Sequence, residues 1–438
     1  MDCLKMCKRE EKISMLSNKR GSSGMNLPDS MSDTTIDTII ATIPAVAPKV
    51  LDITRNFYCR VLRSHPHLLA FFNPAHNFTI SDHQPKALAA AIVAYVSNIK
   101  DVSPLLVPGG PVASICHRHC ALGIFPESYV VVHDNLMESI GHVLGPIVTP
   151  DIANAWSEAV LYLAKAFIDT EESIYTMAEK REGGWSGFID FEVSHIEDVT
   201  SNVKAFTFRP PSRSPLKGKS FEFTSGQYLS LSVDINGDGL TAPRHYTVTS
   251  PPGVDYLQCT VKQIEGGKLS THIHKELKVG DIVKLSAPFG VFTIDEQDHA
   301  EIEGAVLMSA GIGITPMVNF QRTLGSLNKL KLCVHVDANP ESHPYRDHFK
   351  SSDSLGPGKI MEKYSRTPGG KRLSAKELVS ETLNNIDIDI NHNFYICGPE
   401  KWMDAVQNEL VGKKGVKKIM CVVFGSQLAT GCPFFHNS

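Results

Sequence analysis

The chain has 438 residues, of which 42% are hydrophobic, and a formal net charge of −4. This length is enough for several domains, and the small net charge gives no reason to expect nucleic acid or an acidic membrane as a partner. No uninterrupted apolar run approaches the ~20 residues of a membrane-spanning helix. The 10 cysteines are scattered, several inside apolar runs, which favours buried thiols in a reducing compartment over a disulfide framework.

The first 30 residues differ from the rest of the chain. They hold six basic and four acidic residues, and they lack the apolar core of a secretory signal. A mitochondrial transit peptide is poor in acidic residues, so the pair Glu10 and Glu11 argues against one. We therefore expect residues 1–30 to be a disordered extension of a cytoplasmic protein, with mitochondrial targeting through this segment as the alternative.

Residues 31–180 carry helical patterns throughout. Four apolar residues recur at spacings of four, three and four, which places them on one face of a helix. They are Trp156, Val160, Leu163 and Phe167. Glu171 continues this face, where a carboxylate is costly if it is buried without a partner. Two interpretations stay open: the helix is already exposed at Glu171, or Glu171 meets a polar group inside.

Two earlier helices are predicted in the same part of the chain. One runs from residue 48 to about residue 65 and includes Tyr58. The other has Gln84 in its first turn and Leu88 on its apolar face, and Phe72 lies in the apolar run between the two helices. Apolar stripes of this kind usually form a helical core, so they do not define a site by themselves.

The segment 115–129 places His119 in a helical context, with Tyr129 ten positions later. A histidine of this kind is ordinarily a core or surface residue. A zinc site is a second alternative, because Cys116, His117 and Cys120 lie close to His119. Structural zinc sites usually take their ligands from two separate pairs, and no second Cys/His pair follows at a suitable distance.

The glycine-rich segment 181–187 ends the helical spacing and predicts a hinge. From residue 188 to residue 297, short segments alternate apolar and polar residues. In one of them, Leu229 and Leu231 alternate with Ser230 and Ser232. Half-buried strands at short intervals are typical of an antiparallel β-barrel, which we predict for this part of the chain.

The segment 243–249 holds an R-x-Y-[ST] pattern along one predicted strand. Arg244 can neutralise a phosphate, Tyr246 can stack on a flavin ring and Thr247 can hydrogen-bond the flavin edge. His245 lies between these residues and belongs to the same candidate site. We therefore predict FAD binding by this strand.

A glycine pair follows about twenty residues downstream of this strand. Gly266 and Gly267 offer flexible backbone, and Ser270 offers a hydroxyl, to a bound pyrophosphate. The R-x-Y-[ST] pattern alone also fits an ordinary strand. The glycine pair and the domain that follows it favour the flavin site over that interpretation.

Residues 298–426 predict a doubly wound α/β domain, because strand and helix patterns alternate there. The continuous apolar strand at residues 305–310 suits a parallel sheet. Gly311 and Gly313 follow it and let backbone N–H groups approach a pyrophosphate at a helix start. Thr315 suits the N-cap and Pro316 the first helical position. Further strands are predicted at residues 332–336, 394–397 and 419–424, and residues 427–438 form a tail.

These three parts, in this order over about residues 31–426, resemble the flavohaemoglobin family, in which a globin is fused to a ferredoxin-reductase-like FAD and NAD module. The resemblance implies haem b, FAD and NAD(P)H as cofactors. It also implies that His119 is the proximal ligand of the haem iron and that Tyr129 and Glu171 hold its imidazole. The C-x-x-C-H signature is absent, so such a haem would be held without covalent attachment.

The resemblance extends to the other sites. On the distal side of the haem it implies Tyr58, Gln84 and Leu88, with Phe72 packing on the haem. The A-G-x-G-x-T-P-M pattern at residues 310–317 is the one found in ferredoxin-reductase-like enzymes. The nicotinamide-side loop implied by the resemblance is Cys397, Gly398 and Pro399, and Phe424 matches an aromatic residue near the flavin.

Four positions depart from the family pattern. Arg118 replaces a lysine beside the ligand histidine, and Ile314 replaces a glutamine in the nicotinamide loop. Val422 stands where the family usually has a glutamate near the gap between flavin and haem, and Ser426 replaces a proline. The sequence leaves open what the departure at Val422 does to the hydride or electron path and what the departure at Ile314 does to nicotinamide binding.

The function implied by the resemblance is that of an NAD(P)H-dependent nitric oxide dioxygenase, an oxidoreductase that we expect to be a monomer. A hydride passes from the nicotinamide to FAD, single electrons pass to the haem, and nitric oxide and O₂ become nitrate. One alternative is a haem-based sensor of O₂ or nitric oxide, which would need no hydride donor. Another is an NAD(P)H reductase with a vestigial globin. The choice between NADH and NADPH stays open.

Overall fold

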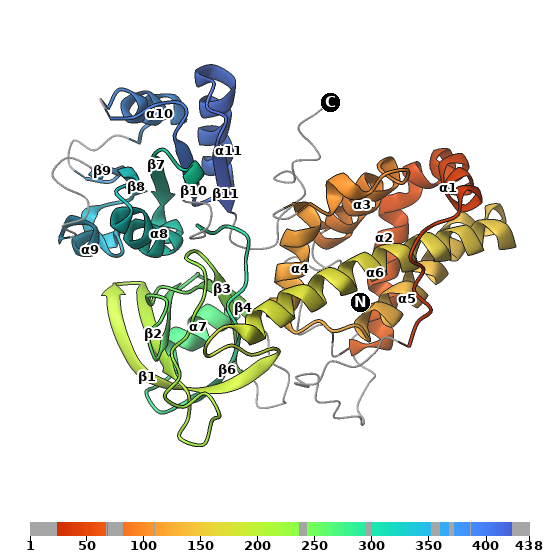
Figure 1. Ribbon diagram of the computed structural model, residues 1–438, viewed down its shortest axis with the longest axis horizontal. Coiled ribbons are helices and arrows are strands. Elements are labelled where there is room, and N and C mark those ends of the chain that lie inside the picture. Colours follow the sequence, from red (N-terminus) through yellow and green to blue (C-terminus); the bar gives the residue numbers. More distant parts are fainter. Residues whose placement is uncertain are drawn as a thin grey trace.

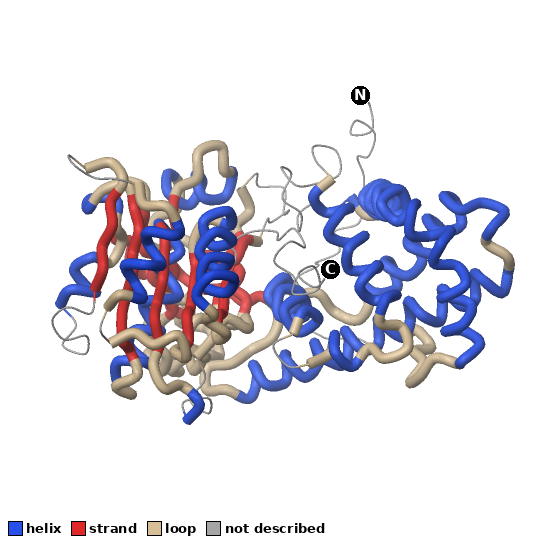
Figure 2. Tube along the Cα trace, turned by 90° about the horizontal axis from the view of Figure 1, so that it is seen from above, coloured by secondary structure: helices blue, strands red, loops and turns tan. Residues whose placement is uncertain are grey.

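The computed structural model describes residues 24–66, 68, 82–107, 110–235, 243–294, 300–351, 360–367, 372–385 and 387–422. Along the chain these residues form a helical part, an antiparallel sheet and a parallel sheet (Figure 1). Seen from above, the helical part occupies one end of the molecule and the two sheets the other (Figure 2). The predicted fold class is confirmed. The predicted tail and all but seven residues of the predicted extension lie outside the described residues.

Helix α6 is the longest element of the described helical part. Its 31 residues begin after Thr149, whose side chain accepts a hydrogen bond from the N–H of Ile152 at 3.4 Å. Trp156 and Ile174 on its inner face are buried. No helix among the described residues is long and apolar enough to cross a membrane. The α-helices of this part are α1 (Asp33–Val46), α2 (Val50–Ser64), α3 (His83–Ser97), α4 (Pro111–Leu122), α5 (Ser128–Leu144) and α6 (Pro150–Lys180).

The antiparallel sheet has six strands in the order β4-β3-β6-β1-β2-β5. Its two edge strands meet at an isolated antiparallel bridge between Val248 and Cys259, so the sheet curls back on itself. Helix α7 (Lys268–Lys275) follows the last edge strand. The strands are β1 (Phe188–Thr200), β2 (Val203–Arg209), β3 (Tyr228–Ser232), β4 (Arg244–Thr247), β5 (Leu257–Lys262) and β6 (Ile282–Ser286).

Strand β3 corrects one expectation. The alternation of leucine and serine predicted a half-buried strand, but Ser230 and Ser232 are 0% and 1% exposed. The curled sheet encloses this face, and the hydroxyl of Ser230 finds a partner within it. Ser230 contacts His245 Nδ1 through its hydroxyl and donates its N–H to Ser286 Oγ, both at 2.9 Å.

The parallel sheet has the order β11-β10-β7-β8-β9. Strand β7, the first in sequence, lies in the centre, and the chain moves away from it first on one side and then on the other. Such a reversal opens a crevice at the carboxyl ends of the central strands, where α/β proteins bind ligands. The strands are β7 (Ala305–Ala310), β8 (Leu330–Asp337), β9 (Ile360–Tyr364), β10 (Asn393–Cys397) and β11 (Ile419–Val422). The helices are α8 (Thr315–Ser326), α9 (Arg346–Ser351), α10 (Ala375–Leu383) and α11 (Glu400–Asn408).

The start of α8 differs from the prediction. Ile314 is the N-cap, and Thr315 is already the first helical residue. The hydroxyl of Thr315 donates to the carbonyl oxygen of Ile312 at 3.0 Å, inside the 3₁₀ turn that precedes the helix, so it is not free to cap. Pro316 shifts to the second position, where a missing N–H still costs nothing because the first turn has no intrahelical acceptor for it.

The predicted hinge at residues 181–187 is tightly packed. A Cβ on Gly183 would lie 2.2 Å from the carbonyl oxygen of Ser220, and one on Gly184 would lie 1.9 Å from that of Ala178. Only glycine fits at these positions without a backbone shift. The connection between α6 and the antiparallel sheet is therefore close and well packed.

The turn at residues 224–227 contacts all three parts of the chain. Arg181, which follows α6, donates hydrogen bonds to Gln227 Oε1 at 2.8 Å and to Thr224 Oγ1 at 2.9 Å. The hydroxyl of Ser225 lies 2.7 Å from that of Thr323 on α8. This turn leads directly into β3, so it fixes the flavin-motif strands relative to the helices on either side.

Candidate active site

Three helices bring His119, Tyr129 and Glu171 together. His119 Nδ1 lies 2.8 Å from Glu171 Oε1 and 3.2 Å from the Tyr129 hydroxyl. That hydroxyl donates to the same Glu171 oxygen at 2.6 Å. Glu171 is 2% exposed and α6 continues to Lys180, so the interpretation with a polar partner inside is the correct one.

The electrostatics fix the roles within this group. Burial, and secondly the charge of Glu171, raise the pKa of Tyr129 well above its usual value, so the phenol stays protonated and donates. Nδ1 of His119 is engaged with the carboxylate, and the ring nitrogen left over is Nε2. A histidine oriented by a carboxylate through one nitrogen and free at the other suits an iron ligand, and the carboxylate raises its basicity.

The cysteines beside His119 do not form a zinc site with it. Cys116 and Cys120 are buried, and their thiols point to the carbonyl oxygens of Phe167 and Glu171 at 3.9 and 3.7 Å. Among the described residues, no group of three His, Cys, Asp or Glu side chains could hold a metal ion. The zinc interpretation therefore has no geometric support in this part of the chain.

The predicted distal residues lie on two adjoining helices. Tyr58 comes from α2, and Gln84 and Leu88 come from α3; all three are half-buried. The hydroxyl of Thr54 donates to the carbonyl oxygen of Pro85 at 2.9 Å, which ties the two helices together one turn from Tyr58 and next to Gln84. Burial raises the pKa of Tyr58, so its hydroxyl remains a donor at neutral pH.

Strand β4 carries the flavin motif. Arg244 and Tyr246 share one side of the strand, and His245 and Thr247 share the other. Arg244 is half-buried, burial lowers its pKa, and its Nη1 donates to the carbonyl oxygen of Pro243 at 2.8 Å. Among the described residues no carboxylate pairs with it, so its half-buried charge suits a phosphate of the flavin cofactor.

Tyr228, which the sequence did not predict as part of the site, lies beside the flavin motif. Its ring centroid lies 4.8 Å from that of His245, and it pairs with Thr247 across β3 and β4. A Cβ on Gly290 would lie 2.9 Å from this ring, so only glycine permits the close approach. The turn at residues 224–227 lies directly before Tyr228 and could have indicated from the sequence that a strand begins there.

The glycine pair downstream forms the start of α7. Gly266 has φ +72°, in the left-handed region, and Gly267 is the N-cap residue of the helix. The hydroxyl of Ser270 accepts a hydrogen bond from the N–H of Ile264 at 3.1 Å and closes this turn. The free N–H groups of the first helical turn remain available to an anion.

The two nicotinamide motifs lie side by side at the crevice of the parallel sheet. A Cβ on Gly313 would lie 2.2 Å from the carbonyl oxygen of Cys397 and 2.7 Å from the N of Gly398, so the two loops touch. Gly311 has φ +53°, and Pro399 is the N-cap residue of α11. The loops after β7 and β10 therefore form one continuous backbone surface.

One of the positions that depart from the family pattern, Val422, adjoins this surface. Val422, half-buried, ends the described part of β11 and pairs in register with Cys397. The departure from the family pattern at this position thus lies next to the nicotinamide loop. Phe72, Phe424 and Ser426 lie outside the described residues.

A contact between α4 and the antiparallel sheet was also missed. The N–H of Gly290 donates to His117 Nδ1 at 3.1 Å. Burial and the positive charge of Arg181 lower the pKa of His117 to about 4, so the ring is neutral at neutral pH and Nδ1 accepts. The partners are 173 residues apart, so no local pattern could reveal this contact.

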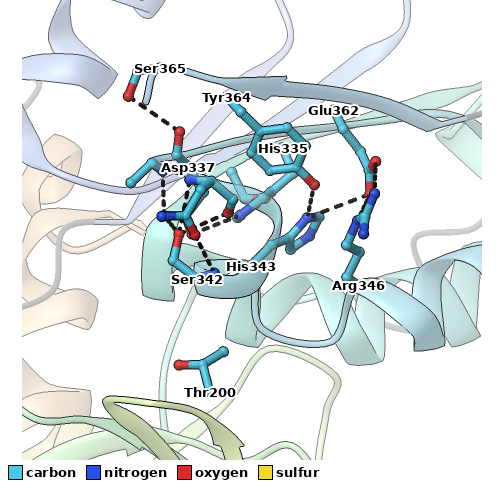
Figure 3. Close-up of polar contacts among 12 residues, drawn as sticks. Thr200, His335, Asp337, Ser342, His343, Arg346, Glu362, Tyr364 and Ser365 are labelled. Atoms are coloured by element: carbon cyan, nitrogen blue, oxygen red, sulfur yellow. Dashed lines mark hydrogen bonds and ion pairs between the residues drawn. The ribbon is translucent and has the colours of Figure 1, made fainter. Parts of the chain in front are cut away.

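Figure 3 shows a buried polar network at the carboxyl ends of β8 and β9. The rings of His335 and His343 stack with centroids 3.8 Å apart. His335 contacts Ser309 Oγ at 2.8 Å through Nδ1, and its Nε2 lies 3.3 Å from Asp337 Oδ2. His343 Nδ1 lies 2.9 Å from the Tyr364 hydroxyl. Burial, and secondly the neighbouring His335, lower the pKa of His343 to about 3.

Comparisons with known proteins agree with this geometry. Three families match in turn: Globin at residues 55–167, the oxidoreductase FAD-binding domain at 190–294 and the oxidoreductase NAD-binding domain at 307–408. The chain is 33% identical to the flavohemoprotein of Bacillus subtilis (strain 168), with 86% of this chain and 93% of that protein covered. It is 30% identical to flavohemoprotein A of Dictyostelium discoideum, with 82% and 89% covered.

A solved structure extends this similarity to the whole fold. The crystal structure of flavohemoglobin from Malassezia yamatoensis with bound FAD and heme matches with a TM-score of 0.76 at 25% identity, and covers 91% of this chain and 100% of that one. The fold and the sites define an oxidoreductase in which a globin is joined to FAD-binding and NAD-binding domains. The chain belongs to the flavohemoprotein family, and the predicted cofactor set agrees with its domains.

Replacing the buried carboxylate, Glu171→Gln, is expected to move the haem reduction potential to a more positive value. A neutral partner makes the His119 imidazole less basic, so less electron density reaches the iron. Spectroelectrochemistry measures the potential. Glu172→Gln, at an exposed position on the same helix, is the matched control. An unchanged or more negative potential in Glu171→Gln alone would show that the carboxylate does not act through His119.

The substitution His343→Phe is expected to make the free energy of unfolding fall less steeply as the pH is lowered. The unfolded chain binds a proton at this residue near pH 6.5, whereas the folded chain does so only near pH 3. Stability contributed by the neutral ring is thus complete above pH 6.5 and is lost as the pH falls toward 3, by about 1.4 kcal/mol per pH unit. Urea unfolding between pH 7 and pH 5 tests this, with the exposed His142→Phe as the control. Equal slopes in parent and variant would contradict it.

Proposed function

We propose that the protein is an NAD(P)H-dependent nitric oxide dioxygenase. The balanced reaction takes one NAD(P)H, two nitric oxide and two O₂ to one NAD(P)⁺, two nitrate and one proton. The observation that carries the proposal is the buried contact of Glu171 and Tyr129 with His119, because it strengthens an axial ligand. A globin that only stores oxygen gains little from that.

The same proposal assigns the domains. We propose a globin domain at residues 31–180, a connection at 181–187, an FAD domain at 188–297 and an NAD(P) domain at 298–426. When bound, the haem would supply an iron centre for the chemistry of O₂ and nitric oxide, and FAD would supply the conversion of a two-electron hydride donor into single electrons. The protein holds these groups in place and sets their electrostatics.

On the proximal side, His119 would hold the haem iron, while Glu171 fixes the orientation of its ring and Tyr129 fixes the carboxylate. On the distal side, Tyr58 donates a hydrogen bond to the oxygen substrate, and Gln84 assists it. The protonated phenol of Tyr58 supports this role, because only a neutral phenol can donate.

The nicotinamide and flavin groups would be held by main-chain groups and by a few side chains of strand β4. Arg244 neutralises a flavin phosphate, and Tyr246 and Thr247 orient the ring system. The touching loops at Gly313 and Cys397 present backbone to the nicotinamide. A side chain at residue 313 would force these two loops apart. This arrangement supports hydride transfer at the crevice of the parallel sheet.

The direct test is consumption of nitric oxide by the purified protein in the presence of O₂ and NADH. We expect nitric oxide to accelerate NADH oxidation, with two nitrate formed for each NADH. NADH oxidation at an unchanged rate, with no nitrate, would favour a reductase or a sensor over the dioxygenase.

Removing one hydroxyl, Tyr58→Phe, is expected to raise the oxygen dissociation rate about ten- to a hundredfold, the range for losing a shielded, charge-assisted hydrogen bond. Nitric oxide consumption should slow, and flavin reduction by NADH should not change. Flash photolysis measures the dissociation rate. Tyr95→Phe is the matched control, because the Tyr95 hydroxyl donates to the carbonyl oxygen of Ala159 at 2.8 Å inside the globin core. A rate within twofold of the parent would exclude Tyr58 as the distal donor.

A further inference from the structure

The helix that carries His119 is attached to the FAD domain through His117. The N–H of Gly290 donates to His117 Nδ1 at 3.1 Å. The His117 ring also meets the ring of Phe289 edge-on, with centroids 6.5 Å apart. Phe289 in turn meets Tyr175 of α6 at 5.9 Å, so this contact joins α4, α6 and the loop after β6.

The FAD-domain side of this contact is held rigidly. Gly290 has φ +133°, and a Cβ there would lie 2.9 Å from the Tyr228 ring. Phe289 and Tyr228 exchange two main-chain hydrogen bonds, both 2.8 Å long. Tyr228 begins β3, which pairs with β4 and its flavin motif. Gly290 therefore moves with the strands proposed to hold the flavin.

The globin side of the contact is equally constrained. His117 lies two residues before His119 on α4. The Tyr175 hydroxyl donates to the carbonyl oxygen of Ile124 at 2.9 Å and contacts that of Cys120 at 3.3 Å, so α6 holds the end of α4. The Gly290–His117 hydrogen bond thus links two rigid bodies, one with the proposed flavin strands and the other with the proposed iron ligand.

We propose that His117 is a positioning residue for electron transfer from the FAD domain to the haem held by His119. The inference rests on the proposed function, in which each turnover needs that transfer. Transfer rates fall steeply as the gap between two redox groups widens. The hydrogen bond to Gly290 limits how far α4 can move from the loop after β6, and so limits that gap.

Two substitutions separate the hydrogen bond from packing. His117→Phe keeps a ring beside Phe289 and removes the acceptor. His117→Asn keeps an oxygen acceptor near the position of Nδ1 and removes the ring. The exposed His142→Phe on α5 is the matched control for the chemical change. Haem content from the Soret band checks that each variant is folded and loaded.

Two readouts are combined on the full-length protein. Anaerobic stopped flow with NADH follows flavin reduction and haem reduction separately, and hydrogen–deuterium exchange follows the amide of Gly290. In His117→Phe we expect haem reduction to slow and the Gly290 amide to exchange faster, each by about fivefold. The loss of one neutral hydrogen bond changes the equilibrium between the docked and undocked domains by about this factor. Flavin reduction should keep the parent rate, and His117→Asn should restore both values toward the parent.

Three results would overturn the inference. One is a Gly290 amide that exchanges in the parent as fast as in His117→Phe. Another is parent-like haem reduction in His117→Phe despite faster amide exchange. The third is a parent in which NADH reduces the flavin but never the haem; that result would refute the proposed function itself, and the inference with it.

Discussion

The buried carboxylate of Glu171 is the constraint on which the arrangement of this protein depends. A carboxylate that is 2% exposed must have partners, because an unpaired charge in the core costs several kcal/mol. The partners here are His119 from α4 and Tyr129 from α5, so one oxygen atom fixes three helices at one point. The same contact leaves the other nitrogen of His119 as the one available to iron.

Helix α6 carries this constraint to the rest of the molecule. It continues beyond Glu171 to Lys180, and Arg181 then holds the turn at residues 224–227. That turn also contacts α8, whose Asn319 donates to the carbonyl oxygens of Val248 and Ser250 at 2.9 and 3.0 Å. The helices around Glu171, the strands of the predicted flavin motif and α8 are therefore linked by one series of contacts. Figure 1 shows α6 running from the helical part toward the antiparallel sheet.

The sequence could predict the parts of this structure that have local signals. Helical spacing placed Glu171 on the inner face of α6, and the strand–glycine–helix order placed Gly311 and Gly313 at the crevice. The predictions were wrong for residues whose hydrogen-bond partner or surroundings lie outside the local sequence pattern. Thr315 turned back to Ile312 instead of capping α8, and Ser230 was enclosed because the sheet curls.

Contacts between distant segments left no local signal at all. Gly290 and His117, which are 173 residues apart, are recognisable as partners only after the fold has brought them together. The resemblance to a family supplied roles for His119 and Tyr58, and the R-x-Y-[ST] pattern supplied one for Arg244. The structure adds physical reasons that support the proximal and flavin roles. The structure also shows contacts between the domains, which could not be predicted from motifs or from residue spacing.

The central claim is that electrons from the nicotinamide reach the haem on His119 through the FAD of the same chain. Anaerobic reduction by NADH, followed in the flavin and Soret bands at several protein concentrations, tests it most directly. We expect the flavin band to bleach first and the Soret band to shift afterwards, at a rate that does not depend on protein concentration. A Soret band that never shifts, or a second rate that rises in proportion to protein concentration, would contradict it.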